Sequence, residues 1–358
     1  MESILPRIEI SLSKIRDNAR MLSLLYGEKG IDLMGVSKAV LGEPLIAKAM
    51  IKGGVCFIAD SRLENIQKMR QAGVSAPLVL LRTPLSQAEA IVQSVDISLN
   101  TEIETIKLLS HFAKAQNKIH QIIIMVEMGD LREGVVQSDL NEFIKETLVL
   151  PHLKIVGLGC NMACYGGIQP DDQKMSALSE QVSSLEREFH LNLEIISGGN
   201  SANFEWVEST EDIGKINNLR IGESILLGRE TLHRRIIPGL HIDAFQLVAE
   251  VLESKQKPSL PFGTICQNAF GEVPSFIDRG IGQRVILALG RQDVPTASLK
   301  SKDQFEILGS SSDHLILDCA NHHLSVGDEV RFDLDYMGLL AAMTSPFIKK
   351  QFIDPHPL

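Results

Sequence analysis

The chain has 358 residues, of which 44% are hydrophobic and 22% charged, and its formal net charge is −10. This composition is typical of a globular protein with a large core, and it excludes disordered and fibrous classes. The acidic excess argues against nucleic-acid binding through phosphate contacts. Because no apolar run reaches the roughly 18 to 20 residues of a membrane span and the N-terminus lacks a signal-peptide pattern, we expect no membrane segment.

The cysteines are few, odd in number and without a C-x-x-C pair, which favours reduced thiols in a cytoplasmic protein. They are Cys56, Cys160, Cys164, Cys266 and Cys319. Cys319 with His322 and His323 could ligate a metal, but a surface loop explains this group better, so we expect no metal site.

Short apolar runs alternate with segments of helical spacing from about residue 31 to 228. The predicted strands are residues 33–36, 55–59, 78–81, 97–99, 122–127, 154–158, 193–196 and 219–222. The predicted helices include residues 44–50, 63–72, 102–113, 140–148 and 173–189. Eight such units predict a (β/α)8 TIM barrel. An open, doubly wound sheet is the alternative, because periodicity cannot show that a sheet closes.

The alternation of apolar runs and helical segments ends after Gly228, and the extended segments that follow are separated by Gly, Pro and Asp. The candidate strands are residues 245–252, 284–289, 304–307, 314–317 and 329–334. We therefore expect a mostly β second domain, with the junction near residues 234–239. The predicted limits are 11–234 for the barrel and 235–358 for the β domain, with residues 1–10 as a candidate addition to the latter.

Two features at predicted strand ends point to one kind of chemistry. Lys38 directly follows the first strand, where barrel enzymes place catalytic groups, although a lysine there can also be a plain surface charge. The small residues 197–201 follow the seventh strand, and Arg220 to Gly222 end the eighth. Loops at these two strands often bind phosphate, although one such loop alone could be only a tight turn. A lysine after strand one with a phosphate cup after strands seven and eight is a pyridoxal phosphate arrangement.

Motifs from about residue 31 to 346 resemble the alanine racemase-type (fold-type III) pyridoxal phosphate enzymes, most closely their ornithine and broad-specificity amino-acid racemase branch. The matching segments, in the order of that family, are GVSKAV, IADSRLENI, VEMGDLREGV, GLGCNMACYGG, SGGNSAN, LRIGESILLGRETL, LHIDAFQLVAEV and DYMGLLAAMTSP. The resemblance implies an N-terminal barrel, a C-terminal β domain and a homodimer whose active sites are each completed by the partner.

The resemblance also implies roles for residues around the cofactor. Lys38 would form the Schiff base with pyridoxal 5′-phosphate and act as one base in racemisation through a quinonoid carbanion. Ser201 and the backbone of Gly222 and Glu223 would hold the phosphate, together with the hydroxyl of Tyr336.

Four further positions match residues of the family near the ring and the substrate. Arg220 would face the pyridine nitrogen, and an always-protonated guanidinium there would leave that nitrogen unprotonated. Arg132 would lie close to the cofactor and the substrate carboxylate, and Asn161 replaces a histidine beside the ring. Ser312 and Asp313 would approach the site from the partner subunit.

The chain departs from alanine racemases at three positions. Gly42 stands where they have a tyrosine near the phosphate, and Met125 replaces their modified lysine. Thr264 stands in place of their catalytic tyrosine, and a threonine hydroxyl is a poor general base. Cys266 could supply the second base if its thiol were activated, although an inert buried thiol is the simpler interpretation.

We therefore predict a cytoplasmic racemase that interconverts the enantiomers of a free amino acid, preferring an ornithine- or lysine-like substrate over alanine. One alternative is a non-catalytic pyridoxal phosphate carrier, but the carriers of this fold lack a C-terminal domain. Another is a D-amino-acid aldolase or dehydratase, but these bind a metal through a His-x-Cys pair that is absent here.

Overall fold

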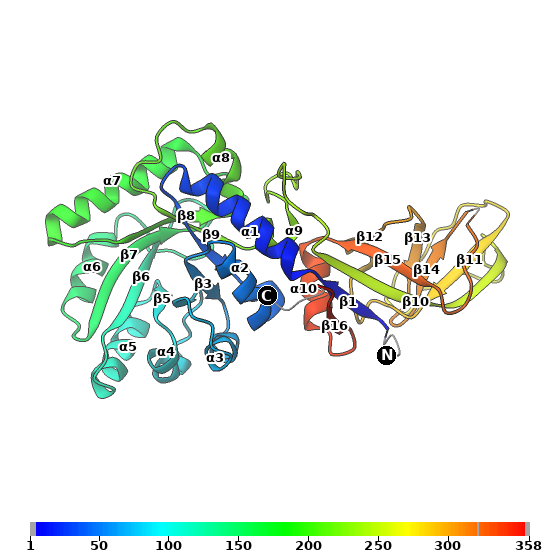
Figure 1. Ribbon diagram of the computed structural model, residues 1–358, viewed down its shortest axis with the longest axis horizontal. Helices are drawn as coiled ribbons and strands as arrows, with labels where there is room; N and C mark the ends of the chain where they lie inside the picture. Colours follow the sequence, from blue (N-terminus) through cyan, green and yellow to red (C-terminus); the bar gives the residue numbers. More distant parts are fainter. Residues whose placement is uncertain (1–4, 321, 355–358) are drawn as a thin grey trace. The chain divides into compact units, whose positions relative to one another are not determined.

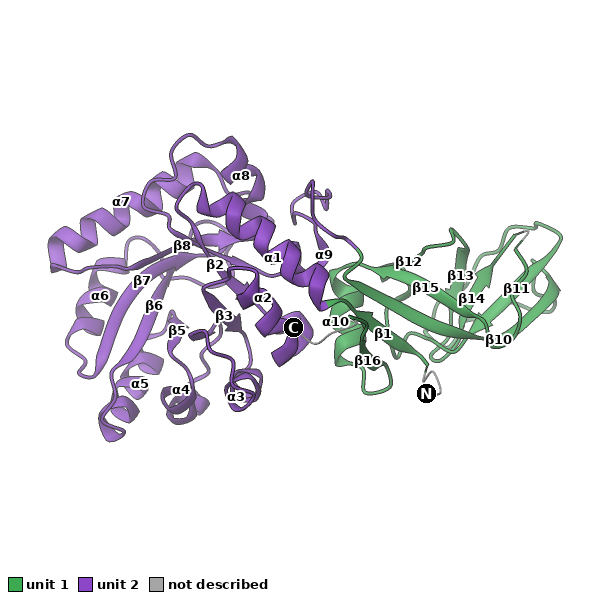
Figure 2. Ribbon diagram, viewed as in Figure 1, with its two compact units in different colours: residues 1–11, 243–357 green, residues 12–242, 358 purple. Residues whose placement is uncertain are grey.

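A computed structural model describes residues 5–320 and 322–354 of the chain. It divides the chain into two compact units (Figure 2). The first runs from Leu12 to Ile242, and the second joins the N-terminal residues up to Ser11 to those from Asp243 onward.

The first unit is a closed barrel of parallel strands (Figure 1). Its strands are β2 (Asp32–Val36), β3 (Phe57–Asp60), β4 (Leu78–Leu80), β5 (Ile97–Asn100), β6 (His120–Val126), β7 (Leu153–Cys160), β8 (Ile195–Asn200) and β9 (Asn218–Ile221). Strand β2 pairs with β9, with Gly35 opposite Ile221, and this pairing closes the sheet. The predicted TIM barrel is therefore confirmed, and the open-sheet alternative is wrong.

The inside of the barrel is filled by apolar side chains from alternate strand positions. Buried residues of this cluster are Met34, Val36, Ala59, Val79, Ile97, Leu99, Ile123, Met125, Val156 and Ile195. Strands buried on both faces read as short apolar runs without strict alternation, which is why the sequence pattern locates them. Chemistry in such a barrel belongs to the strand ends, because the interior is packed.

Helices surround the strands, mostly one after each. They are α1 (Leu12–Gly27), α2 (Pro44–Lys52), α3 (Leu63–Gln71), α4 (Ala88–Ser94), α5 (Ile103–Ala115), α6 (Leu140–Leu148), α7 (Asp172–Phe189), α8 (Phe204–Ser209) and α9 (Glu223–Leu227), with single turns η1 (Lys38–Val40), η2 (Leu85–Gln87) and η3 (Ser201–Asn203). The Asp171 side chain caps α7 by accepting from the Lys174 amide at 2.8 Å. Within the described residues, no helix combines the length and apolar character that crossing a membrane requires.

The second unit is a mostly β structure. Its elements are β1 (Arg7–Ile10), β10 (Phe245–Pro258), β11 (Ile281–Leu287), η4 (Thr296–Ser298), β12 (Leu299–Ser301), β13 (Glu306–Ser310), β14 (Leu315–Asp318), β15 (Glu329–Leu334), α10 (Tyr336–Thr344) and β16 (Lys349–Phe352). The sheet order is β12-β15-β10-β11-β14-β13, and β1 lies between β10 and β16. The N-terminal strand therefore belongs to this unit, since it pairs antiparallel with β10.

The structure differs from the predicted elements at several places. Strand β8 continues through the small residues up to Asn200, which the sequence analysis placed in a loop. Helix α10 was not predicted, because its sequence YMGLLAAMT has almost no polar face that would mark a helical period. The short strands β1, β12 and β16 were also missed, since three or four residues carry too little pattern.

Candidate active site

Lys38 begins the single turn η1 directly after β2, at the carboxyl end of the barrel. The residue before it is fixed by a buried carboxylate, because Ser37 Oγ donates to Asp60 Oδ2 over 2.7 Å. Burial raises the pKa of Asp60, and hydrogen bonds from Asn65 and Ser37 and from the Arg62 amide oppose that shift. Two of those donors, Asn65 Nδ2 and the Arg62 amide, lie 2.9 Å from Asp60 Oδ1. The backbone that carries Lys38 is thus anchored to β3.

The Lys38 ammonium itself is only partly exposed, and it makes no hydrogen bond or ion pair with any residue that the structure describes. Most lysines near buried backbone find a carbonyl or a carboxylate. An amine left without such a partner at the carboxyl end of a barrel is available to react with a carbonyl compound.

Ser201 and the start of α9, which the sequence analysis predicts to form a phosphate cup, lie against each other. Ser201 Oγ accepts from the Ser224 amide over 3.3 Å, which brings η3 against the first turn of α9. A Cβ added to Gly222 would lie 3.1 Å from Val36 Cβ and 3.3 Å from the Val36 carbonyl oxygen, so glycine allows the close approach of β9 to β2. The cup therefore lies beside the strand that leads to Lys38.

The side chain of Glu223 is engaged elsewhere, which leaves its backbone for the predicted phosphate cup. Its carboxylate forms an ion pair with Arg234, and only 10% of the side chain is exposed. Backbone amides at a helix start favour an anion, whereas a free carboxylate at the same place would repel one.

Arg220 lies on β9 and is buried, with 6% of its surface exposed. Its Nη1 donates to Ser197 Oγ over 2.6 Å, and its Nη2 donates to the Cys160 carbonyl over 2.7 Å. Both acceptors are neutral, and within the described residues no carboxylate forms an ion pair with it. Burial lowers its pKa, since the charged form loses hydration.

Arg132 and Asn161 come together at the ends of β6 and β7. In one of its two amide orientations, Asn161 accepts from Arg132 Nη2 over 3.3 Å. In the other orientation, its Oδ1 accepts instead from Asn200 Nδ2 at the end of β8 over 3.1 Å. The Arg132 guanidinium is paired with the neighbouring carboxylate of Glu133, and this hydrogen bond raises its pKa.

Asp130 is a residue that the sequence analysis missed. Its carboxylate is 1% exposed and accepts from the amides of Cys164, Tyr165 and Gly166 over 3.2, 3.1 and 3.0 Å. It therefore fastens the loop after β7 to the loop that carries Arg132. Its place in GDLREG was visible in the sequence, but its partners lie more than thirty positions away.

The departures at Gly42 and Met125 have physical reasons. Gly42 has a φ of +56°, and a Cβ there would lie 2.7 Å from Asn65 Cβ. No larger side chain fits this position. Met125 packs inside the barrel, where a Cβ on Gly159 would come 3.0 Å from its Sδ atom.

The remaining predicted site residues belong to the second unit. Tyr336 begins α10, where the Asp335 side chain caps the helix by accepting from the Gly338 amide over 2.8 Å. Ser312 and Asp313 lie in the exposed turn before β14, and Asp313 Oδ1 accepts from Ser312 Oγ over 3.3 Å. A hydrogen bond with His314 lowers the Asp313 pKa.

Cys266 and Thr264 lie between β10 and β11. Both are exposed, so the expectation that Cys266 is buried is wrong. Neither side chain makes a hydrogen bond within the described residues.

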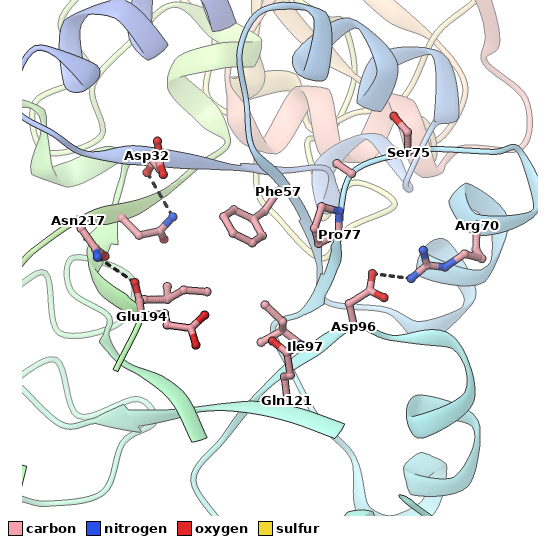
Figure 3. Close-up of a pocket in the computed structure, with 13 residues that line it drawn as sticks. Asp32, Phe57, Arg70, Ser75, Pro77, Asp96, Ile97, Gln121, Glu194 and Asn217 are labelled. Carbon is pink, nitrogen blue, oxygen red and sulfur yellow. Dashed lines mark hydrogen bonds and ion pairs between the residues drawn. The ribbon is translucent and has the colours of Figure 1, made fainter. Parts of the chain in front are cut away.

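A pocket of about 560 Å³ lies at the opposite end of the barrel, at the amino ends of the strands (Figure 3). It is lined by Asp32, Phe57, Arg70, Ser75, Ala76, Pro77, Asp96, Ile97, Gln121, Glu194, Ile195, Asn217 and Asn218. None of the predicted site residues lines it. Because barrel enzymes carry out chemistry at the carboxyl ends of the strands, this pocket is not the active site.

Among the residues that the structure describes, no three His, Cys, Asp or Glu side chains gather as a metal-binding group. His322 instead packs its ring edge-on against Phe305, with 5.5 Å between ring centroids.

A closed barrel of parallel strands together with a mostly β unit is the fold that this chain shares with solved alanine racemases. The alanine racemase of Streptomyces coelicolor A3(2) superposes with a TM-score of 0.79 over 97% of this chain and 98% of its own, at 16% identity. The enzyme from Streptomyces lavendulae gives 0.77 over 99% of both chains, at 15% identity.

The chain belongs to the alanine racemase family: residues 10–230 match the family model for the alanine racemase N-terminal domain. The ornithine racemase of Acetoanaerobium sticklandii is 42% identical over 97% of this chain and 99% of its own length. The lysine racemase of Thermotoga maritima is 38% identical over 98% and 99%, respectively. The predicted family, fold and racemase class are confirmed, and the protein is an amino-acid racemase.

Proposed function

We propose that this racemase interconverts the enantiomers of an amino acid with a side-chain amine, ornithine or lysine, using pyridoxal 5′-phosphate. Two relatives that match nearly the whole chain are named for these substrates, whereas the alanine racemases found among curated relatives match about half of it or less. Thr264 supports the same choice, because a threonine in place of the family's tyrosine leaves more room for a longer side chain.

The cofactor proposal rests on one observation. Two basic side chains without an acidic partner lie in the same barrel unit as a predicted phosphate site. Lys38 has an amine without a partner, Arg220 has a buried charge without an ion pair, and Ser201 meets the amides of α9. An aldehyde for the amine, a ring nitrogen for the guanidinium and a phosphate for the cup are all present in pyridoxal phosphate. When bound, this cofactor supplies an electron sink that makes the Cα–H bond of an attached amino acid acidic.

The side chains then have separate tasks. Lys38 removes or returns the proton on one face of the substrate Cα, and its anchored backbone keeps Nζ at that face. Arg132 binds the substrate α-carboxylate, for which it must exchange its pairing with Glu133. Asn161 supports that arginine and borders the ring, and Tyr336 adds a hydroxyl to the phosphate cup.

Inversion needs a second proton carrier on the other face. We assign this role to Cys266, whose exposed thiol lies two residues beyond Thr264. A thiol becomes an effective base once its pKa falls beside cationic groups. Ser312 and Asp313, on an exposed turn of the same unit, are proposed to reach the site from the partner subunit.

A homodimer is supported by the apolar surface of the segment between β10 and β11. Its exposed hydrophobic residues are Leu260, Phe262, Ile265, Phe270, Val273, Phe276 and Ile277, and Phe262 is 94% exposed. A concentration of such residues marks a contact surface. The free cysteines further support a reducing compartment, and we propose the cytoplasm.

The test is an exchange assay in D2O with pyridoxal phosphate added and L- or D-ornithine, lysine, alanine or serine supplied separately. Exchange of the Cα hydrogen is read by NMR, and inversion by chiral chromatography. We expect exchange with inversion, fastest for ornithine or lysine. Exchange without inversion would show that the enzyme has no second base. No exchange would favour a cofactor carrier. Activity that is lost on chelation and restored by a divalent metal would favour an aldolase or dehydratase.

A further inference from the structure

Arg220 is supported inside the barrel by a column of two polar side chains, Ser197 and Asn218, which extends from the guanidinium toward the amino ends of the strands. Ser197 on β8 and Asn218 on β9 are each 2% exposed, and Ser197 lies two positions after Ile195, a member of the apolar cluster inside the barrel. Ser197 Oγ donates to Asn218 Oδ1 over 2.9 Å, and Asn218 Nδ2 donates to the Asp32 carbonyl over 3.2 Å. The column thus begins at the wall of the amino-end pocket, where Asp32 lies (Figure 3), and ends at the guanidinium.

Chemistry fixes the direction of every hydrogen bond in this column. A guanidinium only donates, so Ser197 must accept from Arg220 with an oxygen lone pair. A carbonyl only accepts, so Asn218 must direct its NH2 group at Asp32 and its oxygen at Ser197. The single hydroxyl hydrogen of Ser197 is then committed to Asn218. No alternative orientation satisfies all three contacts.

The acceptors in the column carry no charge. A carboxylate at either position would neutralise the guanidinium and draw it toward the interior, whereas a hydroxyl and an amide fix its position and leave its full charge for a ligand. Replacing both by apolar groups would leave Arg220 with the Cys160 carbonyl alone.

We propose that Ser197 and Asn218 are positioning residues for Arg220, which orient it toward the ring nitrogen of the cofactor without neutralising it. The effect on activity rests on the proposed function, but the orientation of the guanidinium does not. Loss of one such hydrogen bond should weaken cofactor binding about threefold to tenfold.

The first test uses the cofactor-free protein, so that it is independent of the racemase assignment. NMR of the arginine side chains, with the Arg220 signal assigned through Arg220→Lys, reports rotation of the guanidinium. We expect hindered rotation in the native protein and in Ser197→Thr, and fast rotation in Ser197→Ala. Ser98→Ala is the matched control, because Ser98 is a buried strand serine that bonds His120 Nε2 at 2.8 Å instead. Equal signals in Ser197→Ala and the native protein would overturn the proposal.

The second test uses the loaded enzyme and separates position from charge. Asn218→Asp keeps an acceptor for Ser197 but adds a negative charge, so we expect hindered rotation, a shifted absorbance maximum of the bound cofactor and a lower kcat with little change in KM. The control is Asn217→Asp on the same pocket wall, because Asn217 bonds the Ile196 amide and the Glu194 carbonyl. Identical spectra for Asn218→Asp and Asn217→Asp would contradict a charge-preserving role.

Discussion

Lys38 is positioned by its backbone, because Ser37 and Asp60 fix the turn while the amine stays without a partner. We expect Lys38→Ala to lose the visible absorbance of the bound cofactor, although phosphate contacts still allow weak binding. Absorbance titration with pyridoxal phosphate measures both effects. Lys48→Ala is the control, since Lys48 donates to the Ala72 carbonyl on the outside of the barrel. An unchanged absorbance in Lys38→Ala would mean that another lysine is the anchor.

Arg132 and Glu133 give two substitutions with opposite expected effects. Arg132→Ala should raise KM for the amino acid by about 10- to 100-fold, because a charged hydrogen bond contributes about 1.5 to 3 kcal/mol, and the cofactor spectrum should persist. Glu133→Gln removes the competing carboxylate and should lower KM. Steady-state kinetics measures both, and loss of the cofactor in Arg132→Ala would show that Arg132 holds the cofactor instead.

Gly42 should tolerate no side chain. At a φ of +56°, alanine costs about 1 to 2 kcal/mol in backbone strain alone, and its Cβ would also overlap Asn65. We expect Gly42→Ala to lower the free energy of unfolding by more than Gly73→Ala. Gly73 has a φ of +68° with nothing within 4 Å of an added Cβ, so it isolates the strain. Denaturant unfolding compares the two, and equal losses would show that Asn65 moves aside.

At the scale of elements, β5 and β6 carry a pH-dependent contact. His120 is buried, and burial lowers its pKa from 6.5 to about 4, so the folded barrel keeps its ring neutral. The unfolded chain takes up the proton at its ordinary pKa. Stability from this group is therefore complete above pH 6.5 and falls as the pH drops toward 4.

Between pH 7 and 4.5, we expect His120 to remove about 2 to 3 kcal/mol from the free energy of unfolding. Fluorescence of Trp206, the single tryptophan, reports unfolding of the barrel unit in which it is buried. The pH dependence should be smaller in His120→Gln and unchanged in a variant of the exposed His111. An equal slope in His120→Gln would contradict the assignment.

At the scale of the whole molecule, the residues proposed for one active site are divided between the two units. The barrel carries Lys38, the phosphate cup and Arg220, and the β unit carries Cys266 and Tyr336. A racemase needs proton carriers on both faces of its substrate. The proposed dimer rests on the exposed hydrophobic residues of the segment between β10 and β11.

We expect Phe262→Glu to raise the dimer dissociation constant at least about tenfold, because a charge in the centre of an interface costs more than 1 kcal/mol. Sedimentation velocity over a concentration series measures this change. Val149→Glu is the control, since Val149 is 80% exposed at the end of α6 in the barrel unit. Matching constants for the two variants would exclude the segment from the interface.

The eight barrel strands, the lysine after the first of them and the small residues proposed to bind phosphate are all predictable from the sequence, whereas closure of the sheet is seen only in the structure. Buried parallel strands must be apolar throughout, and anion cups need small residues at strand ends, so both leave a local pattern. The eight predicted strands correspond to β2 to β9 for this reason. The motifs around Lys38, Ser201 and Arg220 were recognisable because each lies within a few residues of its strand.

The contacts that support those residues cannot be predicted from the sequence. The bond between Ser197 and Asn218 joins residues 21 positions apart, and that between Asp130 and Gly166 joins residues 36 apart. The closed sheet brings these pairs together, and their sequence neighbours give no sign of the contact. The place of Ser197 in strand β8 was missed for the same reason. The residues SGGN have the composition of a loop, and they form a strand only because the neighbouring strands pair with them.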